Sequence, residues 1–358
     1  MDLSVEFLGL RFENPLMPAS GPLTGDFDKM KYISQLGVGG MVTKTISVKG
    51  ARVPRPCIYG SNSFALNNEL WSEYPLEDWI KDILPRLKLD LNMPLIVSAG
   101  YTKEDMEYLI PRLDPFADAF EISTHYVGKD LSNIAKTVAT IRKNTRKPIL
   151  MKMSPHVSDP VEFAKMVKDN GGDGVVAINS VGPAMQIDIK KKSTVIGDKS
   201  GFAWMSGPYI KPLALAFVHN IKQNVPDFAV IGVGGVKTAS DVVEFILAGA
   251  DGVQMLSSAL LYGKDLYQKI VDELPKVLQE NGFSSMKEVK NTKLSMLETN
   301  FEPEVPRVDK DKCIMCGLCE KVCPYFAIKI KDEVLVDEKK CFGCSLCSCR
   351  CPKQALML

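Results

Sequence analysis

Two stretches near the C-terminus, CIMCGLCEKVCP at residues 313–324 and CFGCSLCSCRCP at residues 341–352, repeat one cysteine spacing. Each has the form Cys-x2-Cys-x2-Cys-x3-Cys-Pro. The chain has ten cysteines, and all except Cys57 lie in these stretches. Disulfide scaffolds are found in exported proteins, and the acidic start Met1-Asp2 lacks the basic residues of a signal peptide, so a disulfide scaffold is not expected. The spacing therefore predicts metal ligands.

The repeat is typical of a small domain with two iron–sulfur clusters, in which the fourth cysteine of each run reaches across to the other cluster. Two zinc knuckles, the alternative, would pair ligands two plus two and would not explain the third cysteine. Cys349 and Cys57 are left over. The predicted ligand sets are Cys313, Cys316, Cys319 and Cys351 for one [4Fe-4S] cluster, and Cys341, Cys344, Cys347 and Cys323 for the other.

Upstream of this repeat, short apolar runs alternate with amphipathic stretches of helical length. Eight strand–helix repeats over roughly 250 residues predict an α/β fold, a (β/α)8 TIM barrel. An open doubly wound sheet is the rival, but no Gly-x-Gly-x-x-Gly follows the first strand. The expected strands are Leu16–Ser20, Gly40–Lys44, Leu95–Ala99, Ala117–Ser123, Pro148–Met153, Gly174–Asn179, Ala229–Val233 and Gly252–Ser257.

The expected helices lie between these strands, and two have clear N-terminal caps. Ser158-Asp159-Pro160 places proline at an early helical position, and Thr238 is followed three residues later by Asp241. The expected helices are Asp26–Leu36, Lys103–Leu113, Leu131–Asn144, Asp159–Asn170, Lys211–Asn224 and Ala239–Ala248.

The domain boundary is expected after residue 302, so that the barrel spans 1–302 and a small α+β bacterial-type two-cluster ferredoxin domain spans 303–358. Residues 303–310 carry two prolines and four charged residues, which suits a linker. Within the barrel, the connections 45–75 and 180–207 are too long for simple turns. Because both follow strands, we expect them at the catalytic face; surface insertions without a role are the alternative.

Composition excludes several classes of partner. The 358 residues have a formal charge of +1, and no basic run exceeds Lys190–Lys192. Nucleic acid and anionic membranes are therefore not expected partners. No apolar run approaches the roughly 18 residues of a membrane-spanning helix, so a cytoplasmic protein is expected.

Glycines and hydroxyls follow the last two expected strands. The seventh leads into Gly234-Gly235-Val236, and the eighth into Ser257-Ser258-Ala259. Loops after strands seven and eight form the usual phosphate site of a barrel, and a helix N-terminus approached through glycine attracts anions. Together with a tail that transfers electrons, these residues suggest the phosphate of flavin mononucleotide, FMN.

Several motifs occur in the order found in the dihydroorotate dehydrogenase superfamily. Together with the tail, they make the chain resemble most closely the flavin-plus-ferredoxin half of dihydropyrimidine dehydrogenase, a separate subunit in bacteria. The resemblance implies an FMN barrel that oxidises or reduces a carbon–carbon bond next to a carbonyl in a small cyclic substrate. The motifs are NPLMPASG at 14–21, VTKT at 42–45, LNNELWSE at 66–73, MKMSP at 151–155, AINS at 177–180 and GGV at 234–236.

The resemblance also implies roles for individual residues. Lys44 and Lys152 would lie near the flavin ring, where a cation stabilises the reduced anionic flavin; solvated strand ends are the alternative. Asn67, Glu121, Asn179 and Ser180 fall at positions that contact the substrate. The implied cofactor contacts are Ala19, Ser20, Gly21, Lys44, Lys152, Asn179, Gly207, Gly234, Gly235, Ser257 and Ser258.

Two positions depart from the family pattern. The family's fourth strand leads into Asn-Leu-Ser-Cys-Pro, whose cysteine exchanges a proton with the substrate, whereas this chain has Glu121-Ile122-Ser123-Thr124-His125. Thr124 replaces the cysteine, so Thr124 or His125, with Lys44 nearby, would be catalytic; the alternative is that His125 only caps a loop. Glu121 replaces an asparagine by a group that only accepts hydrogen bonds, which suggests a substrate rich in donors or a cation.

The favoured interpretation is an oxidoreductase acting on CH–CH groups. Because no second nucleotide fold is encoded, an NAD(P)H-oxidising flavoprotein subunit or a ferredoxin must exchange electrons with it, in a homo- or hetero-oligomer. The alternatives are an electron-transfer subunit with a changed or inactive barrel, and a non-flavin phosphate-binding barrel fused to a ferredoxin.

Overall fold

The computed structural model describes residues 1–100, 102–123, 130–298 and 301–358. It divides into two compact units, Met1–Leu294 and Ser295–Leu358. The division falls earlier than the expected boundary after residue 302. Residues 292–298 are exposed and belong to no helix or strand, so the first unit ends soon after helix α11 (Met286–Asn291).

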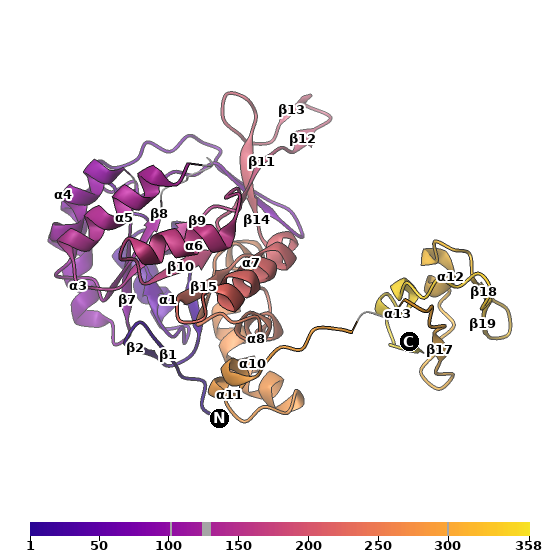
Figure 1. The fold of residues 1–358 in the computed structure, drawn as a ribbon. Coiled ribbons are helices and arrows are strands. Elements are labelled where there is room, and N and C mark those ends of the chain that lie inside the picture. The colour runs from indigo at the N-terminus through magenta and orange to yellow at the C-terminus, as the bar shows by residue number, and fades with distance from the viewer. Residues whose placement is uncertain (101, 124–129, 299–300) are drawn as a thin grey trace. The chain divides into compact units, whose positions relative to one another are not determined.

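Eight parallel strands form the sheet at the centre of the first unit (Figure 1). Each corresponds to one expected strand, although several are shorter than predicted. Neighbours in sequence are neighbours in the sheet, which confirms the barrel and contradicts the doubly wound alternative. The strands are β3 (Leu16–Pro18), β4 (Met41–Val42), β7 (Leu95–Ala99), β8 (Ala119–Ser123), β9 (Ile149–Met153), β10 (Gly174–Ala177), β15 (Ala229–Val233) and β16 (Gly252–Met255).

The barrel closes between β3 and the segment that enters β4. The backbone N–H of Gly39 donates to the carbonyl of Leu16 over 2.8 Å. Asn14 stabilises this closing contact, the seam between β3 and β4. Its side chain donates to the Gly37 carbonyl at 2.8 Å and accepts from the Leu16 N–H at 3.0 Å. The seam thus depends on backbone approach rather than on long side chains.

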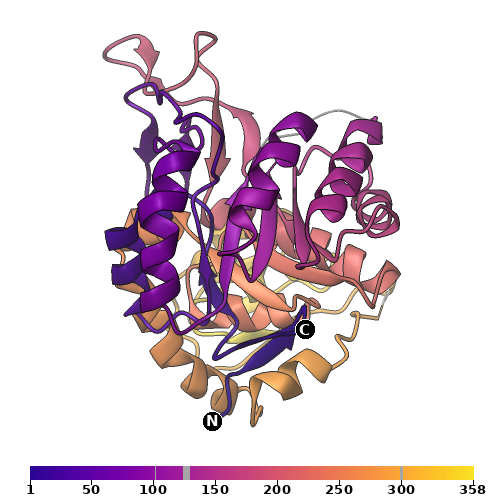
Figure 2. The same cartoon turned by 90° about the vertical axis from the view of Figure 1, so that its left-hand side faces the viewer.

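Helices surround the sheet, as the second view shows (Figure 2). The predicted caps are confirmed: the Asp159 side chain accepts from the N–H groups of Val161 and Glu162, and Thr238 forms a capping box with Asp241. The predicted helices appear as α1 (Phe27–Ser34), α4 (Lys103–Leu113), α5 (Ser132–Asn144), α6 (Pro160–Asp169), α7 (Lys211–Asn224) and α8 (Ala239–Leu247).

Further elements of the first unit were not predicted. A hairpin, β1 (Val5–Phe7) and β2 (Leu10–Phe12), precedes the first barrel strand. A continuous helical stretch between β4 and β7 consists of α2 (Leu76–Asp78), η2 (Trp79–Ile83) and α3 (Leu84–Asp90). The others are η1 (Pro22–Thr24), η3 (Pro208–Ile210), α9 (Ser257–Tyr262), α10 (Leu266–Glu280) and α11.

The two long connections pair with each other. The first supplies β5 (Ile58–Gly60) and β6 (Ala65–Asn67), and the second supplies β11 (Val181–Ala184) and β14 (Ala203–Ser206). They form one antiparallel sheet in the order β11-β14-β6-β5, in which Trp204 pairs with Asn67. The second connection also carries the small hairpin β12 (Ile187–Asp188) and β13 (Ser193–Thr194). A second sheet, rather than loose loops, therefore lies beyond the barrel strands.

The second unit contains two short helices and two antiparallel sheets of two strands each. Strand β17 (Arg307–Val308) pairs with β20 (Leu356–Met357), so the expected linker 303–310 is wrong at its end: Arg307 and Val308 belong to the folded unit. Cys319, Ile328, Cys347 and Leu356 are its buried centre. The remaining elements are α12 (Leu318–Val322), α13 (Leu346–Cys349), β18 (Ile328–Ile330) and β19 (Val334–Val336).

Within the described ranges, no helix is long and apolar enough to cross a membrane.

Candidate functional site

Two adjoining cavities open at the carboxyl ends of the barrel strands. The first extends from Ala19 and Asn67 to Gly234, Gly235, Ser257 and Ser258. The second extends from Gly21 to Lys44, Glu69, Trp71 and Glu121. The residues common to both walls are Ser20, Asn67, Lys152, Asn179, Ser180 and Leu256. One elongated site with two compartments results.

The structure places the predicted barrel residues around these compartments. The first is lined by Ala19, Ser20, Asn67, Lys152, Asn179, Ser180, Gly207, Gly234, Gly235, Ser257 and Ser258. Gly21, Lys44 and Glu121 line the second. Thr124 and His125 lie outside the described residues; Ser123, the last described residue before them, lines the second compartment.

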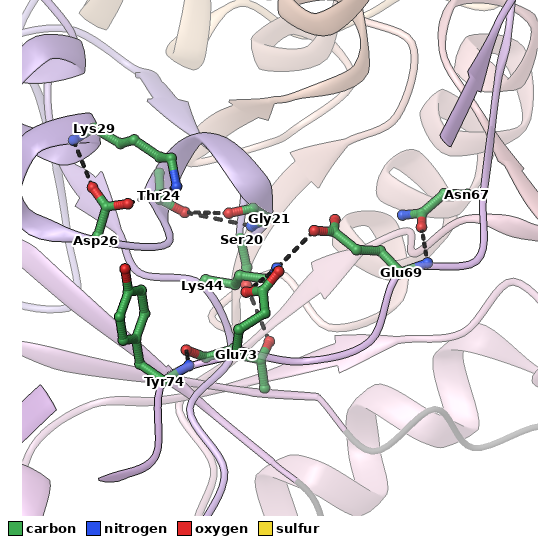
Figure 3. Close-up of polar contacts among 12 residues, drawn as sticks. Ser20, Gly21, Thr24, Asp26, Lys29, Lys44, Asn67, Glu69, Glu73 and Tyr74 are labelled. Carbon is green, nitrogen blue, oxygen red and sulfur yellow. Dashed lines mark hydrogen bonds and ion pairs between the residues drawn. The ribbon is translucent and has the colours of Figure 1, made fainter. Parts of the chain in front are cut away.

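Lys44 follows β4 and is buried, 3% exposed, which contradicts the solvated alternative. Its ammonium group donates to Glu69 Oε1 at 2.7 Å and to Glu73 Oε2 at 2.9 Å (Figure 3). Burial raises the pKa of Glu73, but the hydrogen bond from Lys44, a backbone hydrogen bond and the charges of Lys44 and Lys29 together hold this pKa below its ordinary value. Two carboxylates thus compensate one lysine.

Lys152, in β9, is likewise buried, 9% exposed. It donates to Glu121 Oε1 at 3.1 Å and to Gln254 Oε1 at 3.2 Å. Gln254 in turn donates from Nε2 to Glu121 Oε2 at 2.6 Å. Since β8, β9 and β16 are not all neighbours in the sheet, this closed triangle spans the inside of the barrel.

This triangle changes the interpretation of Glu121. A carboxylate in place of an asparagine suggested a substrate rich in donors or a cation, but both Glu121 oxygens accept hydrogen bonds from the protein and its charge faces Lys152. The side chain is 0% exposed. No cation from the substrate is needed to compensate it.

Hydroxyl groups line the rest of the site. Ser20 and Thr45 share a hydrogen bond of 3.0 Å between their hydroxyls, and Thr45 shares another of 3.0 Å with Ser98. Ser257 donates to Ser206 at 2.7 Å. Among the described residues, the Ser258 hydroxyl is one of few buried polar side-chain atoms with no hydrogen-bond partner. A buried hydroxyl that faces a cavity without a partner indicates a missing polar ligand.

The glycines beside this hydroxyl have the conformation that a close ligand approach requires. Gly234 and Gly235 have φ values of 128° and 83°, a region that other residues rarely adopt. A Cβ at Gly235 would also lie 2.8 Å from the Lys211 backbone nitrogen. The first compartment therefore fits the phosphate end of FMN, with Ser257, Ser258, Gly234 and Gly235 around it.

The cysteines of the second unit line two separate cavities. One is lined by Cys313, Cys316, Cys319 and Cys351, and the other by Cys323, Cys341, Cys344 and Cys347. The remaining cysteine, Cys349, is exposed and lines neither. In each cavity the fourth sulfur accepts a backbone N–H at 3.3 Å, Ala327 to Cys323 and Ala355 to Cys351. Burial raises the pKa of Cys351, but backbone hydrogen bonds, the one from Ala355 among them, together hold this pKa below its ordinary value.

Across the described part of the chain, no group of three or more histidine, cysteine or acidic side chains is close enough to hold a single metal ion.

Some contributors to the site were not predicted. Gln254 and Trp204 belong to none of the sequence motifs. They reach the site only because the fold brings their strands next to strands that are distant in sequence. Glu69 and Glu73 lie within the LNNELWSE stretch, so the signal was present, but only Asn67 was assigned a role from it.

The fold and these compartments define a class: a barrel oxidoreductase that binds a flavin and is continuous with an iron–sulfur unit. The family model described as dihydroorotate dehydrogenase matches residues 2–278, and one described as a 4Fe-4S binding domain matches residues 306–329. The chain belongs to the dihydroorotate dehydrogenase family and is an oxidoreductase of the CH–CH class, which contradicts the non-flavin barrel.

Two relatives illustrate the range of this likeness. The catalytic subunit of dihydroorotate dehydrogenase B (NAD(+)) from Pyrococcus furiosus is 33% identical over 306 residues, 81% of this chain and 98% of the relative. Subunit PreA of the NAD-dependent dihydropyrimidine dehydrogenase of Escherichia coli strain K12 is 28% identical over 355 residues, 90% of this chain and 85% of the relative. The second match thus extends into the cysteine-rich unit.

Proposed function

We propose that this protein is the catalytic subunit of a cytoplasmic enzyme that transfers a hydride and a proton to or from an uncharged cyclic amide or imide. The observation that carries the proposal is the pair of compartments with a common wall, one fitted to FMN and the other to a small ring. FMN would accept or donate the hydride there and exchange its electron pair, one electron at a time, with the clusters.

The second compartment supports an uncharged substrate. Both lysines that line it are already paired, Lys44 with Glu69 and Glu73, and Lys152 with Glu121. A carboxylate on the substrate would meet no uncompensated cation among these residues and would lie near three carboxylates. Asn67, Asn179 and Ser180 offer neutral donors and acceptors, which read a planar ring through its amide groups.

The reaction balances with an external electron partner. In the direction of reduction, one substrate carbon receives a hydride and its neighbour receives a proton, from Thr124 or His125 in our proposal. The two electrons of the hydride come from NAD(P)H through a flavoprotein subunit, or from two reduced ferredoxins. The relatives named as subunits of NAD-dependent enzymes support a hetero-oligomer.

The test is anaerobic purification with flavin extraction and iron analysis, followed by a substrate screen. We expect one FMN and about eight irons per chain. With the flavin reduced, uncharged cyclic amides, imides or enoates should reoxidise it, whereas their ring-carboxylated counterparts should not. Faster reoxidation by the carboxylated compounds would overturn the substrate class.

A second candidate function is an electron-transfer subunit whose barrel no longer acts on a substrate. The departure from the family's cysteine at Thr124 favours it. The same screen separates the two functions, because a flavin that only the electron partner oxidises or reduces would support the second.

The ligand sets of the two clusters are tested by serine substitution. Cys323→Ser should damage the cluster whose other ligands are Cys341, Cys344 and Cys347, and the iron content should fall by about half. The matched control is Cys349→Ser, which should keep both clusters because Cys349 lines neither cavity. Iron analysis and low-temperature EPR of the reduced protein measure both. Loss of a whole cluster in the Cys349 variant would show that the assignment of Cys351 is wrong.

A further inference from the structure

The first compartment has a single charged residue among those that line it, Lys152. The field that this compartment presents to a bound group is therefore governed by Lys152 and by whatever compensates it. Glu121 does so at 3.1 Å, and Gln254 holds both partners in place. The lysine that the family resemblance places beside the flavin thus belongs to an ion pair.

We infer that Glu121 lowers the midpoint potential of the bound flavin by cancelling the charge of Lys152. This inference rests on the proposed function, because it requires FMN in the first compartment. A lone cation beside the flavin stabilises the reduced, negatively charged cofactor and raises its potential. A carboxylate on that cation removes the stabilisation, so the flavin becomes a stronger reductant.

Burial makes the effect of Glu121 large. Its side chain is 0% exposed and that of Lys152 is 8% exposed, so water screens these two charges only weakly. Charges separated by a few ångströms interact far more strongly in such surroundings than at a surface. Gln254 satisfies both groups at once, and this closed set of hydrogen bonds fixes the carboxylate where it compensates the lysine.

The carboxylate at position 121 is a departure of this chain from the family pattern that its sequence resembles. The family pattern has an asparagine at this position, which is uncharged and would leave Lys152 without a counter-charge. Lys44, at the outer compartment, is compensated separately by Glu69 and Glu73. Replacement of Glu121 therefore changes the charge balance at Lys152 alone.

The experiment uses the full-length protein with FMN and clusters in place. Glu121→Gln keeps the side-chain shape and removes the charge. We expect the flavin midpoint potential, measured by anaerobic redox titration against indicator dyes, to rise. Sulfite, which adds to electron-poor flavins, should bind about tenfold more tightly, because the loss of the buried negative charge beside Lys152 favours the addition of an anion to the flavin. The clusters do not bind sulfite in this way, so the bleaching of the flavin band reports on the flavin alone.

Two further variants keep the inference falsifiable if Glu121→Gln folds poorly. Lys152→Met should lower the potential and weaken sulfite binding, and the Glu121→Gln, Lys152→Met double variant should return close to the wild-type value because the pair is removed together. The matched control is Asp251→Asn. Asp251 is also a buried carboxylate paired with lysines, Lys222 and Lys290, but it precedes β16, at the opposite end of the barrel. This control should leave the potential unchanged.

The outcomes distinguish the inference from the proposed function. If the Glu121→Gln variant retains FMN but its flavin potential and sulfite affinity are unchanged, the inference is overturned and the proposed function stands. Wild-type protein that binds no FMN would overturn both. A rise of the potential in Glu121→Gln, reversed in the double variant and absent in Asp251→Asn, is the result expected.

Discussion

Replacing Thr124 by alanine is expected to lower substrate turnover by about 10²–10⁴-fold, the range that a positioned proton donor contributes. Thr124 stands where the family places its cysteine, directly after Ser123, which lines the second compartment. Reduction of the flavin by the electron partner should persist, because that step needs no proton from this loop. Stopped-flow measurement of the two half-reactions separates these effects.

The competing donor, His125, makes a different prediction about pH. A free histidine titrates near ~6.5. If His125 supplies the proton, turnover should fall as the pH rises through this range, and His125→Gln should abolish that dependence. We favour Thr124 because it is the aligned position.

The control for Thr124→Ala is Thr292→Ala, at an exposed threonine that lines neither compartment; this variant should have normal substrate turnover. Full turnover in the Thr124→Ala, His125→Gln double variant would exclude both donors.

Gly39→Ala is expected to destabilise the barrel by more than about 4 kcal/mol, which is exceptional for one methyl group. A Cβ at position 39 would overlap the carbonyl oxygen of Asn14 and would lie 2.9 Å from the Asn14 backbone nitrogen. The obstacle is backbone that is itself held at the seam by the Asn14 side chain, so it cannot move aside cheaply. Loss of the Gly39 to Leu16 hydrogen bond would then open the seam between β3 and β4.

The matched control is Gly282→Ala. Gly282 has a φ of +79°, but a Cβ there would meet no atom within 4 Å. Only the cost of the left-handed conformation remains, roughly 1 kcal/mol. Urea unfolding followed by circular dichroism measures both variants. Equal losses of stability would show that overlap with Asn14 does not limit closure of the barrel.

The sequence by itself determined the eight strands of the barrel, and it predicts the cysteine ligand sets. Strands such as Leu95–Ala99 and helices such as Lys103–Leu113 follow from apolar periodicity and caps, which depend on residues a few positions apart. The cysteine repeat is equally local, because three ligands of each predicted cluster lie within one short run. Both could therefore be predicted before any tertiary contact was known.

Only the tertiary structure decided which charged groups pair in the site and which strands line it. Gln254 and Glu121 meet although 133 positions separate them, and Lys44 meets Glu69 from a connection whose strands were not predicted. Strands β6 and β14 pair only because the barrel brings two distant insertions to the same edge. Periodicity reports which face of an element is apolar, but it does not report which distant element lies opposite. The charge of Lys152 was thus readable in the sequence, whereas its compensation by Glu121 follows from the closure of the barrel.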